Sequence, residues 1–562
     1  MSPPVDNLET TPAGSAATAT PAADGPTDDA AGNAGAATST SAGASAPHRS
    51  GTPVPFNGIL FAAPAAAADS SATMPDYFHD LGLDQIVATV TADWQEYDLA
   101  PFFQQRLDDL SAITCRQEVM RELENPGLMQ IVRSFSHRMH ALRALREQTD
   151  KLHYRYQKER WFLQAADLYG NAVQELLRDL SAVELTSQGL NAWRAWLAQY
   201  VHSDAFEGLI RDTADLKNAL AAIRYSVSIR DGDVTVRHGE DEADYSAVIE
   251  EVFAKFRQGA VKDYRVRLPA GPGMNHVEAQ ILDGVATLNP ETFAALDGYC
   301  DRHGQYLDDT VARFDREIHF YIAWLSHIGR LRQAGLEFCY PQLSCSKAVG
   351  ATGTFDLALA DALVKTRTAV VRNDFDLREP ERILVVTGPN HGGKTTFARL
   401  FGQLHHLGSL GCPVPGQQAR LFLCDRIYSH FEREEDINTL RGKLQDDLVR
   451  MHRILSQATE RSIVIVNEIF ASTTLQDALF LGRKLMTALS KLDSLAVCVT
   501  FLDELAAFND RTVSMVGTVD PADPAIRTFH IERRPADGLA YAMAIARKYH
   551  VTYDDLMARI RP

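Results

Sequence analysis

The segment that most constrains this chain is GPNHGGKT, residues Gly388 to Thr395. It fits the pattern GxxxxGK(S/T), and it lies directly after the apolar run ILVVT and before the helical pattern TTFARLFGQLHHLG. Glycines at such a strand-to-helix turn let backbone N–H groups surround phosphate oxygens, while the lysine adds a charge and the threonine hydroxyl an oxygen ligand for Mg²⁺. The order of strand, loop and helix therefore predicts a nucleotide-binding loop, and a glycine-rich turn without a ligand is the alternative that it disfavours.

A second apolar strand, SIVIVNE, residues 462–468, delivers two polar side chains at its carboxyl end. Glu468 is the candidate to orient or activate water, and Lys394 is the second candidate catalytic residue. Thr395 and Asn467 are the candidates to hold Mg²⁺, although the Asn467 amide brings no negative charge and we expect it to weaken metal binding. The pattern therefore predicts an ATPase with slow turnover. The residues predicted to contact the nucleotide are Gly388, Pro389, Asn390, His391, Gly392, Gly393, Lys394, Thr395 and Thr396.

The apolar runs RILVVTG, SIVIVNE and LAVCVTF alternate with helical patterns, which is typical of a parallel sheet covered by helices. Amphipathic helical patterns precede this α/β region, and Asp231-Gly232 between β-branched residues predicts a hairpin among them. After Asn289-Pro290 one helical pattern continues for nearly fifty residues, which predicts a rod roughly 70 Å long. Gly298 and Gly304 are the two positions at which this rod can bend or break. The predicted division is a disordered tail at 1–53, helices at 54–223, a β-containing insertion at 224–288, a long helix at 289–344, the α/β domain at 345–530 and a helical segment at 531–562.

Composition excludes several classes of protein. Residues 1–53 are rich in small and polar side chains and cannot offset their ordering entropy by burial. The seven scattered cysteines form no CxxC pair, so the sequence predicts neither a zinc site nor a disulfide framework. Apolar runs are too short to cross a membrane, and ILFAAPAAAA at 59–68 has no basic flank of a signal peptide. We expect a cytoplasmic protein that makes no contact with a membrane.

Four segments, in this order, carry a resemblance to a known family: VVTGPNHGGKTTFARLFGQLHHLGSLGCPVP, LSQATERSIVIVNEIFASTTLQDALFLG, VTFLDELA and RPADGLAYAMAIARKYHVTYDDLMARI. Together they resemble the carboxyl-terminal ATPase domain of the MutS family of DNA mismatch repair proteins. The resemblance implies an ABC-type P-loop ATPase domain after an α-helical core and lever, with the β-containing insertion at the place of the DNA clamp. It also implies that Asn373 lines the adenine side of the site, and that the chain forms a homodimer, with 531–562 as its dimerisation segment.

Three departures from the family pattern concern the catalytic cycle. The Walker B aspartate is replaced by Asn467, the switch histidine by Phe501, and the Ser-Thr pair that reaches a neighbouring site by Gly442-Lys443. Lys443 either offers a charge to the γ-phosphate or is a solvated lysine. The family's mismatch reader, with its Phe-x-Glu motif, and the nuclease tail of the second MutS branch have no counterpart here, so we expect branched or unpaired DNA rather than mismatches as the ligand.

Basic residues gather in two stretches despite a net charge of −17. Phosphate binding needs such charges on one face, but a charged helix face is often only solvated, and the acidic run GEDEAD near the second stretch argues against contact. The candidates for DNA contact are Arg138, Arg143 and Arg146 in the first stretch and Lys262, Arg265 and Arg267 in the second.

Two functions remain in view. The first is a dimeric, MutS-like ATPase of DNA repair or recombination that binds ATP, Mg²⁺ and DNA. The second is a nucleotide-gated scaffold with little or no turnover whose partner is another protein. An ABC-type ATPase outside the MutS family is disfavoured because no LSGGQ-type signature is present.

Overall fold

The computed structural model describes residues 56–60, 74–231, 233–239, 273–432, 442–523, 525–536, 546 and 549–559. They belong to one compact unit, Pro53–Pro562. The predicted tail at 1–53 and the predicted DNA contacts Lys262, Arg265 and Arg267 lie outside the described residues.

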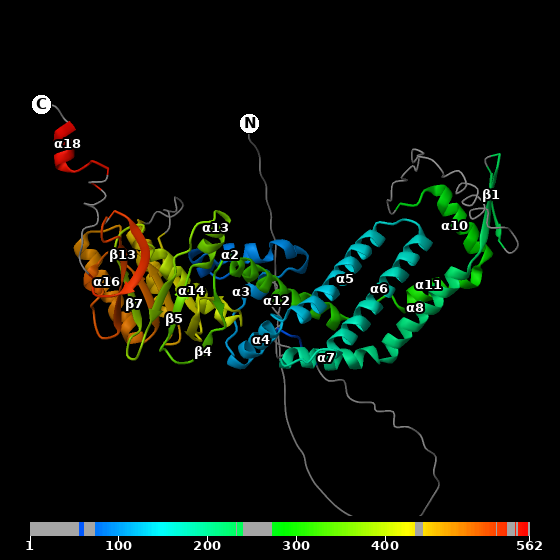
Figure 1. Ribbon diagram of the computed structural model, residues 1–562, viewed down its shortest axis with the longest axis horizontal. Helices are drawn as coiled ribbons and strands as arrows, with labels where there is room; N and C mark the ends of the chain where they lie inside the picture. The colour runs from blue at the N-terminus through cyan, green and yellow to red at the C-terminus, as the bar shows by residue number, and fades with distance from the viewer. Residues whose placement is uncertain are drawn as a thin grey trace, which may run out of the picture. The chain divides into compact units, whose positions relative to one another are not determined.

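Helices form the first part of the described chain, as the amphipathic patterns predict (Figure 1). Several begin at a capping side chain: Asp109 accepts hydrogen bonds from the backbone N–H groups of Ser111 and Ala112, and Asn275 forms a capping box with Glu278. The elements are α1 (Tyr77–Leu81), α2 (Leu83–Thr91), η2 (Ala92–Tyr97), α3 (Ala100–Gln104), α4 (Leu110–Glu122), α5 (Pro126–Asp150), α6 (Arg155–Ser181), α7 (Gln188–Val201), α8 (Asp204–Ala222), β1 (Tyr225–Arg230), β2 (Asp233–His238), α10 (His276–Leu288), α11 (Pro290–Arg302) and α12 (Asp309–Gln333).

The hairpin predicted around Asp231-Gly232 is confirmed. Strands β1 and β2 pair antiparallel, with Tyr225 opposite His238 and Arg230 opposite Asp233. Asp231 adopts a φ of 54° in the turn, a conformation that aspartate tolerates better than most residues.

The helical pattern after Asn289 is divided into α11 and α12, so it does not form one continuous rod. α11 ends at Arg302, beside Gly304, one of the two positions at which the sequence allows a break. Asp308 caps the start of α12 by accepting hydrogen bonds from backbone N–H groups. Between the two helices, Tyr306 is buried with its ring centroid 5.2 Å from that of Phe162 and 5.7 Å from that of Tyr169. Burial of the Tyr306 ring against α6 stabilises the chain in this broken conformation.

An α/β region follows the helices. Its elements are β3 (Phe338–Cys339), β4 (Gln342–Ser344), β5 (Gly350–Thr354), α13 (Leu357–Lys365), β6 (Asn373–Asp376), β7 (Ile383–Thr387), α14 (Lys394–Ser409), β8 (Val414–Pro415), β9 (Gln418–Phe422), β10 (Ile427–Phe431), α15 (Lys443–Gln457), β11 (Ile463–Asn467), α16 (Leu475–Leu492), β12 (Leu495–Val499), η3 (Asp503–Leu505), β13 (Thr512–Val519), β14 (Arg527–Arg533) and α18 (Tyr553–Arg559).

The main sheet has the strand order β10-β11-β12-β7-β13-β14. Its strands are parallel from β10 to β13, and β14 pairs antiparallel with β13. The predicted parallel pairing of the three apolar runs is therefore confirmed. A smaller sheet, β4-β9-β5-β6, and a short pair, β3-β8, accompany the main sheet.

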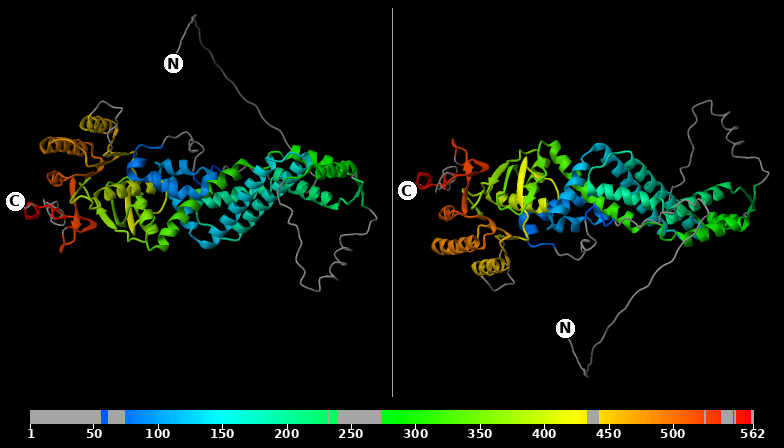
Figure 2. Two further views of the ribbon diagram at one scale, coloured as in Figure 1. Left: turned by 90° about the horizontal axis from the view of Figure 1, so that it is seen from above. Right: turned by 90° about the horizontal axis from the view of Figure 1, so that it is seen from below.

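Both faces of the main sheet are covered, which explains why its central strands are continuous apolar runs. Leu384 and Val386 of β7 pack in the core that contains α14 and the preceding helices, whereas Ile383 and Val385 pack in a second core with α15 and α16. Figure 2 shows α16, in orange, and α14 on opposite sides of the strands. The carboxyl ends of β7, β11 and β12 thus meet at one edge of a rigid layer.

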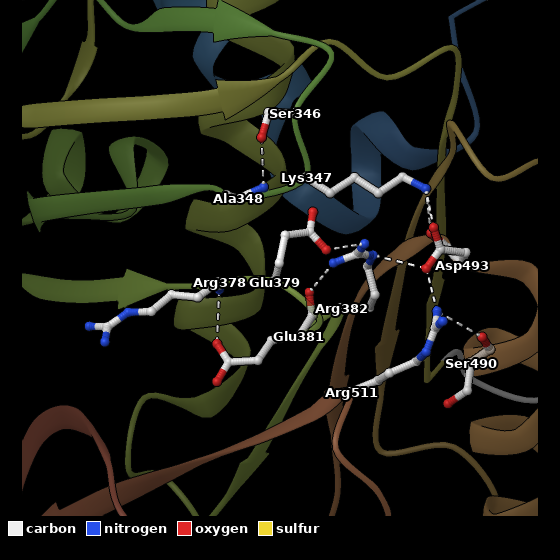
Figure 3. A network of polar contacts seen from close by, with 10 residues as sticks. All are labelled: Ser346, Lys347, Ala348, Arg378, Glu379, Glu381, Arg382, Ser490, Asp493 and Arg511. Carbon is white, nitrogen blue, oxygen red and sulfur yellow. Dashed lines mark hydrogen bonds and ion pairs between the residues drawn. The ribbon is translucent and has the colours of Figure 1, made fainter.

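The opposite edge of the sheet is fixed by a cluster of ion pairs around Asp493, which follows α16 (Figure 3). Lys347 Nζ lies 2.7 Å from Asp493 Oδ2, Arg382 Nε lies 3.0 Å from Oδ1, and Arg511 also pairs with Oδ1. Burial acts to raise the pKa of Asp493, but the hydrogen bond from Lys347 and the three positive charges hold it below its usual value. The cluster ties together the residues that precede β7, β12 and β13.

Candidate functional site

The loop between β7 and α14 follows a backbone path that requires glycine. Gly388 has a φ of 114°, and a Cβ atom there would lie 2.8 Å from the backbone nitrogen of Gly517. Gly393 has a φ of 92°, and a Cβ atom on Gly392 would lie 2.9 Å from the Pro389 oxygen. The loop ends at Lys394, where α14 begins and its first N–H groups have no partner within the helix. The sequence motif therefore folds into an anion-accepting cradle.

Lys394 is held inside this cradle and is 4% exposed. Its Nζ donates hydrogen bonds to the carbonyl oxygens of Gly388 and Pro389 at 3.1 and 3.2 Å, and to Asn390 Oδ1 at 3.2 Å. Glu468 Oε1 lies 3.6 Å from the same nitrogen. Burial lowers the pKa of Lys394, and the charge of Glu468 opposes that effect.

Asn467 and Thr395 meet beside the lysine. Asn467 ends β11 with 8% of its surface exposed, and its Oδ1 accepts a hydrogen bond from Thr395 Oγ1 at 3.1 Å. Glu468 follows with a φ of 54°, and its backbone N–H donates to the Val499 oxygen at 2.9 Å. This left-handed residue turns the chain at the strand end, where the Glu468 side chain is 22% exposed.

A cavity of about 530 Å³ opens over the loop. Phe529 in β14 and Leu359 in α13 line it, although no sequence motif marks either residue. Phe529 has a φ of 61° and is 47% exposed, so its conformation is visible only in the folded chain. The cavity brings together most of the predicted loop residues with Glu468: it is lined by Leu359, Asn390, His391, Gly392, Gly393, Lys394, Thr395, Thr396, Glu468 and Phe529.

Asn373 lies behind Phe529. Its side chain is 9% exposed and joins β6 to β14, since Nδ2 donates to the Phe529 oxygen at 3.2 Å and Oδ1 accepts from the Ile531 N–H at 2.7 Å. Asn373 therefore positions one wall of the cavity, and it is not among the described residues that line it.

Phe501 lies against the predicted catalytic lysine. It follows β12, is 48% exposed, and its ring centroid is 4.6 Å from Lys394 Nζ. An ammonium group at this distance from an aromatic face is attracted to the ring electrons. Lys443, the first residue of α15, pairs with Glu432.

The basic stretch on α5 is more strongly engaged than its sequence indicates. Arg143 pairs with the buried carboxylate of Asp315, and Arg138 pairs with Glu175. Burial raises the pKa of Asp315 to about 6, although the charge of Arg143 opposes that rise. Two neighbouring helices, α6 and α12, thus supply carboxylates to Arg138 and Arg143, whereas Arg146 is exposed. Contact of these three arginines with DNA stays a prediction.

Two negative findings apply to the described residues alone. In these ranges, no helix is both long enough and apolar enough to cross a membrane. In the same ranges, no three side chains of His, Cys, Asp or Glu are grouped so that they could hold a metal ion.

Known proteins resemble the region that contains this site. Residues 384–549 match the family model described as MutS domain V. The DNA mismatch repair protein MutS of Zymomonas mobilis is 31% identical over 179 residues, 32% of this chain and 19% of that protein. That of Oleidesulfovibrio alaskensis is 32% identical over 149 residues, 26% of this chain and 16% of the relative. The DNA mismatch repair protein MutS 2 of Halobacterium salinarum is 27% identical over 187 residues, 33% of this chain and 22% of that protein. The chain thus matches less than a quarter of the length of each of these relatives.

Proposed function

We propose, because residues 384–549 match the family model MutS domain V, that the chain is a member of the MutS family and an ATP-binding, slowly ATP-hydrolysing protein of DNA repair or recombination. The observation that carries the proposal is the cavity in which Lys394, Thr395 and Glu468 converge over a glycine-rich loop. The proposal covers ATP, Mg²⁺, branched or unpaired DNA and a second copy of the chain as partners.

The residues present fit a nucleotide with its metal ion. The loop amides and Lys394 would hold the phosphates, and Thr395 and Asn467 offer adjacent oxygen atoms on the metal side. When bound, Mg²⁺ would neutralise phosphate charge. Asn467 orients the Thr395 hydroxyl by accepting its proton in a hydrogen bond, but it leaves the local negative charge one unit lower than an aspartate would.

Glu468 is the residue that we propose for positioning water. Its carboxylate is partly exposed at the cavity and lies 3.6 Å from Lys394 Nζ, so it can accept a proton from a water molecule only after the lysine turns toward phosphate. Slow turnover follows from the combined loss of one metal-side charge at Asn467 and the lysine contact of Glu468.

Steady-state ATP hydrolysis of the native chain and two variants tests this assignment. We expect Asn467→Asp to lower the Mg²⁺ concentration that gives half-maximal rate and to raise the rate, since a carboxylate adds charge beside Thr395. Glu468→Gln should lower kcat by about 10²-fold or more while ATP still binds. If Asn467→Asp changes neither the rate nor the Mg²⁺ dependence, the role given to the amide is wrong.

DNA binding is proposed for the helical part, with Arg146 as the exposed candidate on α5. Anisotropy titrations of duplex, mismatched and branched DNA across salt concentrations test it, and we expect the branched DNA to bind most tightly. Arg146→Ala should reduce the slope of log affinity against log salt by about 1, as expected for one phosphate contact. The control is Arg178→Ala, since Arg178 is also an exposed arginine but lies on α6. Absence of binding to any of these DNAs at low salt would contradict the DNA proposal.

A nucleotide-gated scaffold that binds a protein partner is the second candidate. Phe501 favours it, because an aromatic ring over Lys394 would compete with phosphate for the lysine. Tight ATP binding without measurable turnover, together with no DNA binding, would select this function.

The domain assignments and the cytoplasmic location are parts of the same proposal. The helices at 54–223 and 289–344 would act as the lever, and the hairpin β1-β2 would lie in a clamp-like insertion. The proposed division is 54–223 and 289–344 for the helical core and lever, 224–288 for the insertion, 345–530 for the ATPase domain and 531–562 for the dimerisation segment.

A further inference from the structure

A five-residue segment, Phe56–Leu60, is held by side chains of three helices. The described chain contains it between two ranges, 1–55 and 61–73, that the structure does not describe. Ile59 and Leu60 are 4% and 2% exposed. The segment is far in sequence from every helix that holds it except α4, so its docking is a tertiary contact rather than part of a helix.

Buried polar side chains form hydrogen bonds with the backbone of this segment. Glu317 Oε2 accepts hydrogen bonds from the N–H groups of Ile59 and Leu60 at 2.7 and 3.3 Å. Tyr321 Oη donates to the Ile59 oxygen at 2.7 Å, and Arg116 Nε donates to the Leu60 oxygen at 2.8 Å. Glu317, Tyr321 and Arg116 are 4%, 0% and 1% exposed. Burial raises the pKa of Glu317, and the two backbone N–H groups oppose that rise.

Two features select the sequence of the segment. Gly58 has a φ of 137°, and a Cβ atom there would lie 2.6 Å from Glu317 Oε2. The Phe56 ring packs on α7, with its centroid 5.2 Å from that of Trp193 and 6.3 Å from that of Trp196. The surface therefore accepts an aromatic residue, a glycine two positions later and two aliphatic residues after it.

We propose that Arg116, Trp193, Glu317 and Tyr321 form a sequence-specific peptide-binding site, here called the arm site, and that its ligand is Phe56–Leu60 of the same chain. A segment recognised through its backbone by preformed, buried side chains needs no covalent link to its site. The link raises the effective concentration of the segment, and the same pattern supplied as a free peptide competes for the same contacts. The ATP and DNA chemistry proposed above does not require this site.

One residue, Arg116, connects the arm site with the helix that follows the glycine-rich loop. Arg116 also donates a hydrogen bond from Nη1 to the oxygen of Leu410, which caps the carboxyl end of α14 at 3.2 Å. Leu60 and the helix that begins with Lys394 thus share one guanidinium group.

The test uses a fluorescent peptide of residues 54–61, VPFNGILF, and the full-length chain. Gly58→Ala in the chain should vacate the arm site, because alanine clashes with Glu317. We expect the peptide to bind this variant at least about tenfold more tightly than the native chain, where the tethered segment competes. The peptide with alanine at position 58 should bind neither chain. Equal or absent binding of the native peptide to a folded Gly58→Ala chain overturns the proposal.

A second experiment keeps the proposal testable if Gly58→Ala does not fold. A protease site placed within residues 61–73 of the otherwise native chain allows the tether to be cut after folding. The released amino-terminal fragment should co-elute with the remainder in gel filtration. An excess of the native peptide should displace it, whereas the Gly58→Ala peptide should not. Loss of the fragment without competitor overturns the proposal. Exchange of fragments only within a dimer would place the segment of a second copy in the site and would overturn the same-chain assignment.

Discussion

At the scale of single residues, Phe501 contacts the lysine of the proposed nucleotide site, which the motif residues also surround. The ring lies over Lys394 Nζ, the group that the loop also holds through two carbonyl oxygens. Phosphate must compete with the aromatic face for this ammonium group. Phe480 and Lys484 on α16 form a contact of the same type, with the nitrogen 5.5 Å from the ring centroid, and neither residue lines the cavity.

We therefore predict that Phe501→Leu tightens ATP binding about two- to fivefold, because it removes an attraction of about 0.5–1 kcal/mol that favours the empty site. Titration with a fluorescent ATP analogue measures the affinity. Phe480→Leu is the matched control and should leave the affinity unchanged. An affinity for Phe501→Leu that equals or falls below that of the native chain would show that the ring does not restrain Lys394.

At the scale of elements, α14 joins the loop to the helices that precede the sheet. His405 and His406 near its end are buried, and His406 contacts both α1 and α3: Nε2 lies 2.8 Å from the Phe103 oxygen and Nδ1 lies 3.2 Å from the Tyr77 hydroxyl. Burial lowers the pKa of His405 to about 4 and that of His406 to about 3. Both rings are therefore neutral in the folded chain at neutral pH.

This burial makes the free energy of unfolding depend on pH. Above pH 6.5 the histidines are neutral in both the folded and the unfolded chain, so their protonation does not lower the free energy of unfolding. As the pH falls below 6.5, the histidines become protonated in the unfolded chain but stay neutral in the folded chain. Each histidine therefore lowers the free energy of unfolding by about 1.4 kcal/mol per pH unit until its folded pKa is reached.

We predict that His405→Leu makes the loss of unfolding free energy between pH 7.5 and 5.5 smaller by about 1.4 kcal/mol. Urea unfolding followed by tryptophan fluorescence at both pH values measures this difference. Phe401→Leu is the control, since Phe401 packs on His405 with centroids 4.4 Å apart but does not titrate. Its destabilisation should be the same at both pH values, and an unchanged pH dependence in His405→Leu would contradict the prediction.

At the scale of the whole molecule, the described chain ends in a helix whose apolar side chains face solvent. Tyr553 is 76% exposed, Met557 is 54% exposed and Leu556 is 41% exposed on α18. Apolar groups gathered on a short, exposed helix are stabilised by a partner surface, and the proposed homodimer supplies one.

We predict that Met557→Asp together with Leu556→Asp shifts the chain from dimer to monomer, because a carboxylate cannot be buried at the proposed interface without a partner. Sedimentation velocity across protein concentrations measures the shift. Leu475→Asp is a control at an equally exposed position, 70% exposed, at the start of α16. A monomeric native chain, or a double variant that dimerises as well as the native chain, would contradict the assignment of 531–562.

The glycine-rich loop and the hairpin at Asp231 could be predicted from the sequence because each depends on residues that are neighbours along the chain. The parallel sheet could also be predicted, although its paired strands are distant in sequence, because its buried strands are continuous apolar runs that alternate with helices. The folded structure was needed to show which of the two glycines after Asn289 lies at the helix break, that Arg143 pairs with Asp315, and that Phe529 lines the cavity. Each of these depends on a partner that is distant in sequence, and a helical or charged pattern is the same whether that partner is present or not. The docking of Phe56–Leu60 is the clearest case, since its glycine is required by a carboxylate on α12.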